Sequence, residues 1–280
     1  MTADVRAACR HYEPDRYIAA LLAPRSLRND LIAIAAFSSE LLRVGDTVRE
    51  PMIGQIKLQW WYDTLEPLAR GDNGGHPVAD AAGGAMRRHR LPPKLFGSLI
   101  EARISDLETG PPADAAALKD YLVQSEGALI RLALRVLGVE ITPQINATAD
   151  QAAIAYGMAR MLVRLPRALR RFGRRGPAVH RLEAAGLGEG LEEEGPRLTL
   201  ALAGVLTDLR QEARDALGVM RQSTDRLEPR ALTAFLPLVM VEPYLRAQEQ
   251  VGFDPLSDLV EVAPLRRVWR IWRAHRRKRL

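Results

Sequence analysis

The chain has 280 residues, of which 47% are hydrophobic and 26% charged, so it is able to bury a sizeable core. The formal net charge is +6 and the isoelectric point is about 9.8, which suits an anionic partner such as a lipid headgroup, a diphosphate or a nucleic acid. A single cysteine, Cys9, excludes a disulfide framework, a cysteine zinc site and a CxxC redox pair, and it fits a reducing compartment.

Neither a targeting sequence nor a membrane-spanning helix is predicted. Residues 1–17 carry charges where a signal peptide needs an apolar stretch, and they are too few for a transit peptide. No run of about 18 apolar residues occurs. We therefore expect a cytoplasmic protein that is peripheral to the inner membrane.

Apolar residues recur at helical spacing along most of the chain, and no stretch shows the alternation of a β-strand. This predicts an all-α fold in one domain over 1–263, followed by a basic amphipathic segment over 264–280. Ser26 fits the N-cap of one helix and Pro229 the first turn of another. Residues 173–195, rich in glycine and charge, are predicted to be a loop. The predicted helices cover residues 14–24, 26–46, 52–69, 76–89, 92–109, 115–137, 147–172, 197–222 and 229–249, with a last one from about 264.

Asp46 and Glu50 are four residues apart at the end of the predicted helix 26–46. On one continuous helix such a pair shares a face and presents oxygen ligands to Mg²⁺. Pro51 follows directly and disfavours the helical conformation for Glu50. The pair is therefore either a magnesium site or, as we favour, a solvated helix end.

The residues around Asp46 resemble the squalene/phytoene synthase family. The shared pattern is AFxxExxxxxD, then a proline, then KLxWWxxxLE. Active members carry roughly RxxDDxxD on this helix, and without gaps that pattern falls on Ser39, Leu42, Arg43 and Asp46. The resemblance implies an isoprenoid synthase fold, a single helical bundle around a central cavity. Of the carboxylates that would bind metal on this helix, only Asp46 is retained.

A second stretch, 157–172, resembles the other metal-binding helix of the family, GxAxQxxNxxRDxxxD. The matching residues are Gly157, Ala159 and Arg167. The amide and carboxylate positions are filled by Met161, Arg164, Ala168 and Phe172. Pro166 is expected to interrupt this helix. Residues 160–175 are rich in arginine, which repels Mg²⁺, so they form either an anion-binding surface or a solvated basic helix face.

The segment YLVQSEGALIRLA resembles the YCxxVAG segment of the family through Tyr121 and Gly127. In the family this tyrosine lines the cavity, although a single tyrosine is commonly an ordinary core residue. The resemblance implies that Asp46 and Tyr121 are family-equivalent remnants of catalytic residues, and no catalytic residue is assigned. The expected cavity is apolar, and the residues assigned to it are Leu42, Arg43, Asp46, Tyr121, Gly127, Gly157, Met161, Arg164 and Arg167.

The resemblance is nearest to a divergent branch of the family, which contains a mitochondrial complex I assembly factor and bacterial relatives. That branch shares ELxxVxDxVxE, found here from Glu40 to Glu50, then QWW, and the DRY at residues 15–17 fits it too. It implies a catalytically degenerate protein without a cofactor, which has a membrane-peripheral binding or assembly role in complex I biogenesis. The alternative is an active, Mg²⁺-dependent prenyltransferase that joins two farnesyl or geranylgeranyl diphosphates head to head. Expected partners are an anionic membrane surface, an isoprenoid or other lipid, and a respiratory-complex subunit. Nucleic acid is not expected, because no recognition module is present.

The segment 264–280 combines tryptophan with arginine. One helical stripe is formed by Leu265, Val268, Trp269 and Trp272. Arginines, among them Arg270 and Arg273, fill most other positions. Such a helix binds at the interface of an anionic membrane. Alternatively, the tryptophans dock the helix onto the domain and leave a basic tail beyond Arg273.

Overall fold

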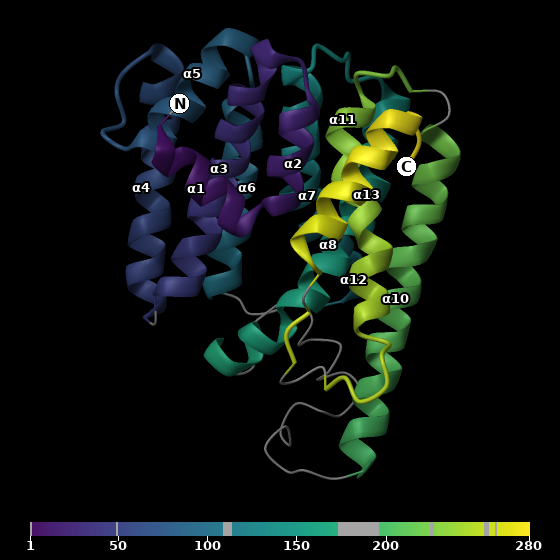
Figure 1. The fold of residues 1–280 in the computed structure, drawn as a ribbon. Coiled ribbons are helices and arrows are strands. Elements are labelled where there is room, and N and C mark those ends of the chain that lie inside the picture. The colour runs from purple at the N-terminus through teal and green to yellow at the C-terminus, as the bar shows by residue number, and fades with distance from the viewer. Residues whose placement is uncertain are drawn as a thin grey trace.

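A computed structural model describes residues 2–48, 50–108, 114–172, 196–224, 227–254, 258–260 and 262–280. At residues 108, 167–172, 196–202 and 224 it describes the backbone alone. The described residues form helices and no strand, which confirms the predicted all-α fold (Figure 1). The helices are α1 (Ala3–Tyr12), α2 (Pro14–Leu22), α3 (Arg25–Thr47), α4 (Pro51–Arg70), α5 (Pro77–His89), α6 (Pro93–Glu108), α7 (Ala115–Val136), α8 (Pro143–Phe172), α10 (Pro196–Thr224), α11 (Leu232–Phe235), the 3-10 helix η2 (Leu236–Met240), α12 (Val241–Ala247) and α13 (Pro264–Arg277).

Prolines and helix caps set many of these boundaries. α2, α4, α5 and α13 each have a proline in the first turn, where its missing N–H costs no hydrogen bond. The Asp114 carboxylate accepts a hydrogen bond from the backbone N–H of Ala117 at 2.8 Å and so caps α7. Gly71, with φ of 109°, ends α4 in the left-handed conformation that glycine adopts readily. Because these signals are local, most predicted helices agree closely with the observed ones.

Two predicted helix starts are wrong, and one helix was not predicted. α3 has Pro24 at its N-cap, so Ser26 lies inside the first turn rather than capping it. The predicted helix 229–249 is divided into α11, η2 and α12, and Pro229 lies in a turn before them. Pro237 lacks the N–H that would continue α11, and the chain forms the 3-10 helix there instead. α1 was missed because it is short and its mean hydropathy is low.

The structure also contradicts two other local predictions. Pro166 lies inside α8, which continues to Phe172, so the expected interruption of this helix is wrong. The chain beyond Arg273 is helical as far as Arg277 rather than a free tail. The predicted loop over 173–195 lies outside the described residues.

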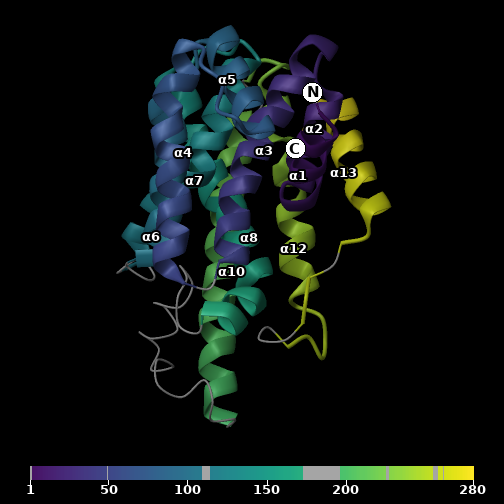
Figure 2. The same cartoon turned by 90° about the vertical axis from the view of Figure 1, so that its left-hand side faces the viewer.

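α3 is the central helix of the bundle, and α1, α2, α4, α5, α6 and α7 all pack against it (Figures 1 and 2). Every residue from Asp30 to Leu42 is buried, so α3 is enclosed on all sides. Phe37 meets Trp61 of α4 and Phe96 of α6 edge to face, with ring centroids 5.2 and 5.1 Å apart. These contacts fix the middle of α3 against α4 and α6. On the other side of the bundle, α8 packs between α7 and α10.

α13 packs against α2 and η2 (Figure 2). Ile271 is fully buried there, and Arg267 forms an ion pair with Asp15 of α2 at 2.8 Å. The tryptophans do not dock the helix, since Trp269 and Trp272 are each about half exposed. α13 is therefore held on the domain by a face other than its tryptophan stripe. None of the described helices combines the length and the hydropathy that crossing a bilayer requires.

We predict that Ile271→Ala lowers the free energy of unfolding by about 2–5 kcal/mol, because it removes a fully buried side chain that docks α13. Val268→Ala, on the exposed face of the same helix, should change it by less than about 0.5 kcal/mol. Urea denaturation followed by circular dichroism measures both values. Equal losses would contradict the assignment of the two faces.

Candidate functional site

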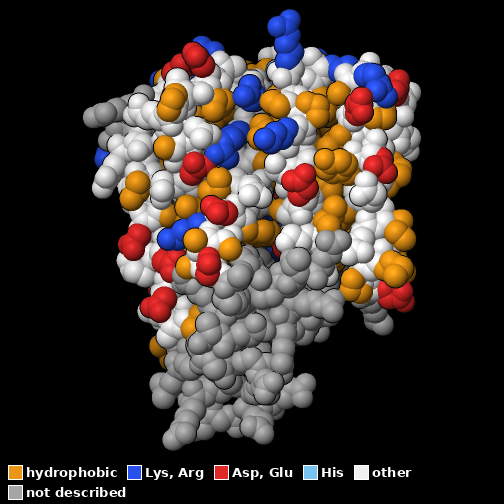
Figure 3. All heavy atoms as spheres, turned by 180° about the vertical axis from the view of Figure 1, so that it is seen from behind, with side chains coloured by type: hydrophobic (Ala, Val, Ile, Leu, Met, Phe, Trp, Pro, Cys, Tyr) orange, Lys and Arg blue, Asp and Glu red, His pale blue; other side chains and the backbone are white. Residues whose placement is uncertain are grey.

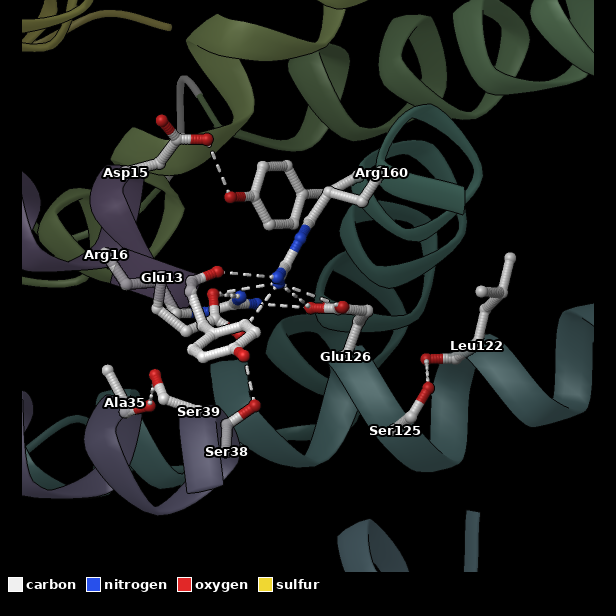
Figure 4. Close-up of polar contacts among 12 residues, drawn as sticks. Glu13, Asp15, Arg16, Ala35, Ser38, Ser39, Leu122, Ser125, Glu126 and Arg160 are labelled. Carbon is white, nitrogen blue, oxygen red and sulfur yellow. Dashed lines mark hydrogen bonds and ion pairs between the residues drawn. The ribbon is translucent and has the colours of Figure 1, made fainter. Parts of the chain in front are cut away.

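Four charged side chains meet in the interior, where the junction of α1 and α2 adjoins α7 and α8 (Figure 4). Arg160 of α8 donates hydrogen bonds to Glu13 at 2.8 Å and to Glu126 at 3.1 Å. Arg16 donates to the same two glutamates, at 2.7 and 2.6 Å. Ser38 of α3 donates to the other oxygen of Glu13 at 3.0 Å. Each arginine thus bridges both carboxylates, and we refer to these four charged residues as the arginine–glutamate network.

The arginine–glutamate network is almost fully buried, with 0–12% of each side chain exposed. Two guanidinium groups face two carboxylates, so charge is balanced inside the protein. Burial raises the pKa of Glu126, but Arg160 and then Arg16 outweigh it, and the pKa falls to about 2. Burial alone would lower the pKa of Arg160, whereas Glu13 and Glu126 hold it well above its ordinary value. Glu126 and Arg160 therefore stay charged at neutral pH.

Close approach of α7 and α8 brings Glu126 within reach of Arg160. A Cβ atom on Gly157 would lie 2.7 Å from Leu122 Cδ2 and 3.2 Å from Glu126 Cγ, so a larger residue would require the Leu122 and Glu126 side chains to shift. Arg160 follows Gly157 by three residues and lies on the same face of α8. Gly157, which matches the family pattern, thus allows the close packing of α7 and α8 that brings Glu126 to Arg160.

Asp15 forms a second buried group beside the network. Its Oδ2 accepts hydrogen bonds from the hydroxyls of Tyr156 at 2.8 Å and Tyr244 at 2.6 Å, and its Oδ1 lies 2.8 Å from Arg267 Nε. Burial raises the pKa of Asp15, and Arg267 and the two tyrosines oppose this rise. The carboxylate therefore ties α2 to α8, α12 and α13 at one point.

A cavity of about 1050 Å³ opens beside both groups. Its wall mixes arginines and aspartates with aromatic and aliphatic side chains, which suits a ligand with an anionic end and an apolar body. The described lining residues are Arg10, His11, Tyr12, Pro14, Asp15, Asp46, Tyr156, Arg160, Val163, Arg164, Tyr244, Val260 and Arg267.

Asp46 lines this cavity and is bound by an arginine. It lies in the last turn of α3, and Arg164 Nη2 of α8 donates to both of its carboxylate oxygens at 3.3 Å. Burial lowers the pKa of Arg164, and the neighbouring Asp46 carboxylate offsets part of this effect. The charge that faces Asp46 from the second family helix is therefore cationic, where the family pattern requires metal-ligand oxygens.

These residues do not fit the Mg²⁺ ions that the resemblance implies for active members. Glu50 is exposed at the N-cap of α4, beyond the end of α3, as the proline after it predicted. Leu42 is buried, and Arg43 donates to Glu40 at 2.8 and 2.6 Å. Among the described side chains, no group of three or more His, Cys, Asp or Glu is arranged to hold a metal ion. Mg²⁺ demands near-octahedral oxygen ligation, which this set does not supply.

Tyr121 was expected to line the cavity, but the structure places it between α6 and α7. Its hydroxyl accepts a hydrogen bond from Arg103 at 2.7 Å and donates one to Asp106 at 3.0 Å. The described lining of the large cavity includes neither Tyr121 nor Leu42. Between α2, α3 and α7 a second cavity measures only about 30 Å³, room for about one water.

Other residues assigned to the cavity also lie at helix interfaces. Gly127 of α7 faces Ala153 of α8, to which a Cβ atom would come within 3.4 Å. Met161 packs against the hydrophobic core from a partly buried position. Asp46 and Arg164 are therefore paired in the wall of the large cavity, whereas Gly127 and Met161 are not among its described lining residues. The side chain of Arg167 lies outside the described residues.

Four residues of this site were not predicted from the sequence: Glu13, Asp15, Arg16 and Glu126. The first three occur in EPDRY, whose DRY matches the divergent branch. Charges at the start of a helix are usually solvated, so the pattern gave no sign of burial. Two features of the sequence could have indicated these buried ion pairs. Three charged residues occur close together in EPDRY, and the arginines of α8 have no acidic residue one helical turn away with which to pair.

The sequence matches the model of the squalene/phytoene synthase family over residues 9–273. It is 28% identical to NADH dehydrogenase (ubiquinone) complex I, assembly factor 6 from Homo sapiens over 247 residues, which cover 88% of this chain and 72% of that protein. The protein of the same name from Bos taurus shows the same identity and coverage. Squalene synthase HpnC from Alicyclobacillus acidocaldarius has a similar structure, with a TM-score of 0.71, 22% identity, and coverage of 90% of this chain and 94% of that one. The structural similarity shows a shared isoprenoid synthase fold.

We predict that the free energy of unfolding falls as the pH is lowered from about 5 to about 2, and that Glu126 contributes to this fall. Its folded pKa of about 2 is below the ordinary 4.5, so the unfolded chain binds more protons in this range. The stability that this lowered pKa contributes is present above this range and lost below it. Urea denaturation at several pH values measures it.

Glu126→Gln should flatten this pH dependence and also lower stability at pH 7, because Arg160 loses a buried partner. Glu66→Gln is the matched control, since Glu66 is 82% exposed on α4 and should keep the slope of the wild-type protein. An unchanged slope in Glu126→Gln would contradict the buried, ionised state of this carboxylate.

Proposed function

The chain belongs to the squalene/phytoene synthase family, and from this premise we propose that it is a non-catalytic member with a binding or assembly role in respiratory complex I biogenesis. Its curated relatives in animals are named as complex I assembly factors. Family membership alone does not decide between this role and catalysis, because one fold hosts many functions. The residues in the cavity supply the argument.

The ion pair between Asp46 and Arg164 is the main observation that supports a non-catalytic role. Head-to-head prenyl coupling requires the departing diphosphate to be neutralised, in the family by metal ions held between two carboxylate-bearing helices. Here the retained carboxylate of one helix is bound by an arginine of the other, 3.3 Å away. The described cavity offers no second set of oxygen ligands, because its other carboxylate, Asp15, is bound by Tyr156, Tyr244 and Arg267. The cavity residues are thus suited to binding and not to metal-assisted ionisation.

The same cavity supports binding of a lipid. Arg10, Arg160 and Arg164 line it together with Tyr12 and Val163, so an anionic head and an apolar chain both find contacts. An isoprenoid or another lipid is the ligand class that we propose for it. We further propose a cytoplasmic location peripheral to the inner membrane, where a respiratory-complex subunit would be the protein partner.

We predict no squalene or phytoene above background when the protein is incubated with farnesyl or geranylgeranyl diphosphate and Mg²⁺. The reason is that Asp46 has an arginine as its neighbour instead of further carboxylates. Product extraction and chromatography measure the outcome. Metal-dependent product at ordinary enzyme rates, abolished by Asp46→Asn, would overturn the proposal and establish the prenyltransferase alternative.

Deletion of the gene in its native host tests the assembly role. We expect less assembled complex I on native gels and lower NADH oxidation by membranes. Glu66→Gln, an exposed substitution on α4, should restore complex I as well as the wild type does. Gly157→Val should not restore it, since the side chain would collide with those of Leu122 and Glu126 between α7 and α8. Normal complex I in the deletion strain would contradict the proposal.

A further inference from the structure

α13 presents two opposite faces. The inner face docks on the domain through Ile271 and the ion pair of Arg267 with Asp15. The outer face carries the apolar stripe predicted from the sequence, and all of its members are exposed by 45–84% of their surface: Leu265, Val268, Trp269 and Trp272. At about 100° per residue the centres of these two faces are separated by roughly 130°. The docked helix therefore leaves its tryptophans directed away from the domain.

Basic side chains flank the exposed stripe. Residues 264–280 contain no acidic residue. The basic residues outside the docked face are Arg266, Arg273, Arg276, Arg277, Lys278 and Arg279, whereas Arg270 is partly buried beside that face. Within the described part of the chain, the ion pair made by α13 is that of Arg267 on its inner face. Burial, then Arg266, Arg246 and Arg273, lower the pKa of Arg270, which shows how closely the cations are gathered. Residues 264–280 thus contribute no acidic side chain to this surface, and Glu242 of α12 is a neighbouring carboxylate that offsets part of the effect on Arg270.

Arginine and tryptophan are held next to each other on the outer face. The Arg273 guanidinium lies over the Trp269 ring at 4.8 Å from its centroid, and that of Arg276 over Trp272 at 5.9 Å. Each pair places a cation at the level of an indole ring. Indole rings and guanidinium groups both favour the headgroup boundary of a bilayer, where the ring meets apolar chains and the cation meets phosphate.

The position of α13 leaves this face accessible, since the helix lies at the outer edge of the described bundle (Figure 2). The opposite side of the molecule has a different character. There, in the described part of the surface, acidic, basic and hydrophobic side chains are interspersed (Figure 3). The combination of exposed tryptophan with unpaired positive charge is thus a local property of α13 and not a consequence of the net charge of +6.

We propose that the outer face of α13 is the surface by which this protein binds an anionic lipid bilayer, with Trp269 and Trp272 at the headgroup boundary and the flanking arginines on lipid phosphates. The inference rests on the peripheral membrane location proposed above and assigns a surface to it. Positive charge without acidic residues complements an anionic bilayer, and two half-exposed tryptophans suit its boundary. Because Arg267 and Ile271 dock the helix, it binds as a rigid part of the domain.

Flotation of the full-length protein with vesicles tests the proposal. We expect binding to phosphatidylcholine vesicles that contain about 30% phosphatidylglycerol, little binding to phosphatidylcholine alone, and weaker binding at high salt. Trp269→Ala/Trp272→Ala should lower partitioning about tenfold or more. Met52→Ala/Ile56→Ala is the matched control, because these side chains are also exposed but lie on α4, and it should bind as the wild type does.

A second pair of variants tests the charges. Arg266→Gln/Arg277→Gln should lower partitioning roughly tenfold or more, whereas Arg25→Gln/Arg135→Gln removes the same charge from exposed sites on α3 and α7 and should have little effect. All four arginines are exposed, so these variants are expected to fold, and circular dichroism checks this.

Equal binding to neutral and anionic vesicles would overturn the proposal, as would equal loss in the two arginine pairs. Self-association of the purified chain that Trp269→Ala/Trp272→Ala abolishes would instead assign the face to a second copy. Vesicle binding does not involve complex I, so its failure is distinguishable from failure of the assembly role. Normal vesicle binding with normal complex I in the deletion strain would refute only the assembly role.

Discussion

The arginine–glutamate network is the interaction on which the arrangement of this molecule depends. Four charges removed from water are tolerated only because each arginine meets both glutamates, at 2.6–3.1 Å. The partners come from the junction of α1 and α2 and from α7 and α8, so satisfying the charges fixes these helices relative to one another. Removal of one member would leave an unpaired buried charge, which costs more than replacing the whole set by apolar residues. Of the four residues, Arg160 also lines the large cavity.

Under the proposed function, arginines on α8 give the cavity a chemistry different from that of a metal-dependent synthase. In the family pattern this helix and α3 face each other with carboxylates, and ions between them bind diphosphate. Here Arg160 is neutralised by glutamates and Arg164 by Asp46, so the two helices are joined directly by protein charges. Under the proposed function the cavity retains the size of a ligand site, about 1050 Å³, while the positions of the metal ligands serve ion pairs. Folding stability and ligand recognition then depend on the same residues.

α13 connects this interior to the surface. Arg267, on the inner face of this helix, lines the cavity and pairs with the buried Asp15. The tryptophans on its outer face remain exposed. A helix that is docked by one stripe and carries a second apolar stripe outside is unusual for an isolated domain, because an exposed tryptophan side chain loses the stabilisation that burial gives. The proposed contact with a bilayer would cover that second stripe. It would also place the cavity wall that contains Arg267 near the membrane, where a lipid ligand is available.

Sequence alone determined the helical class, most helix boundaries and the family resemblance, because proline, glycine, apolar spacing and motif residues act or are recognised locally. It also identified the stripe of α13. Only the tertiary structure decided which partners the charged residues have. The sequence around Arg160 predicts either a solvated or an anion-binding surface, whereas Arg160 pairs with Glu13, 147 positions away in the chain. Tyr121 likewise fits a family motif but bonds to Arg103 and Asp106. Pairing over such separations depends on how α7, α8 and α2 pack, and no local pattern encodes that distance. The same holds for α13, whose periodicity defines two faces but not which of them the domain covers.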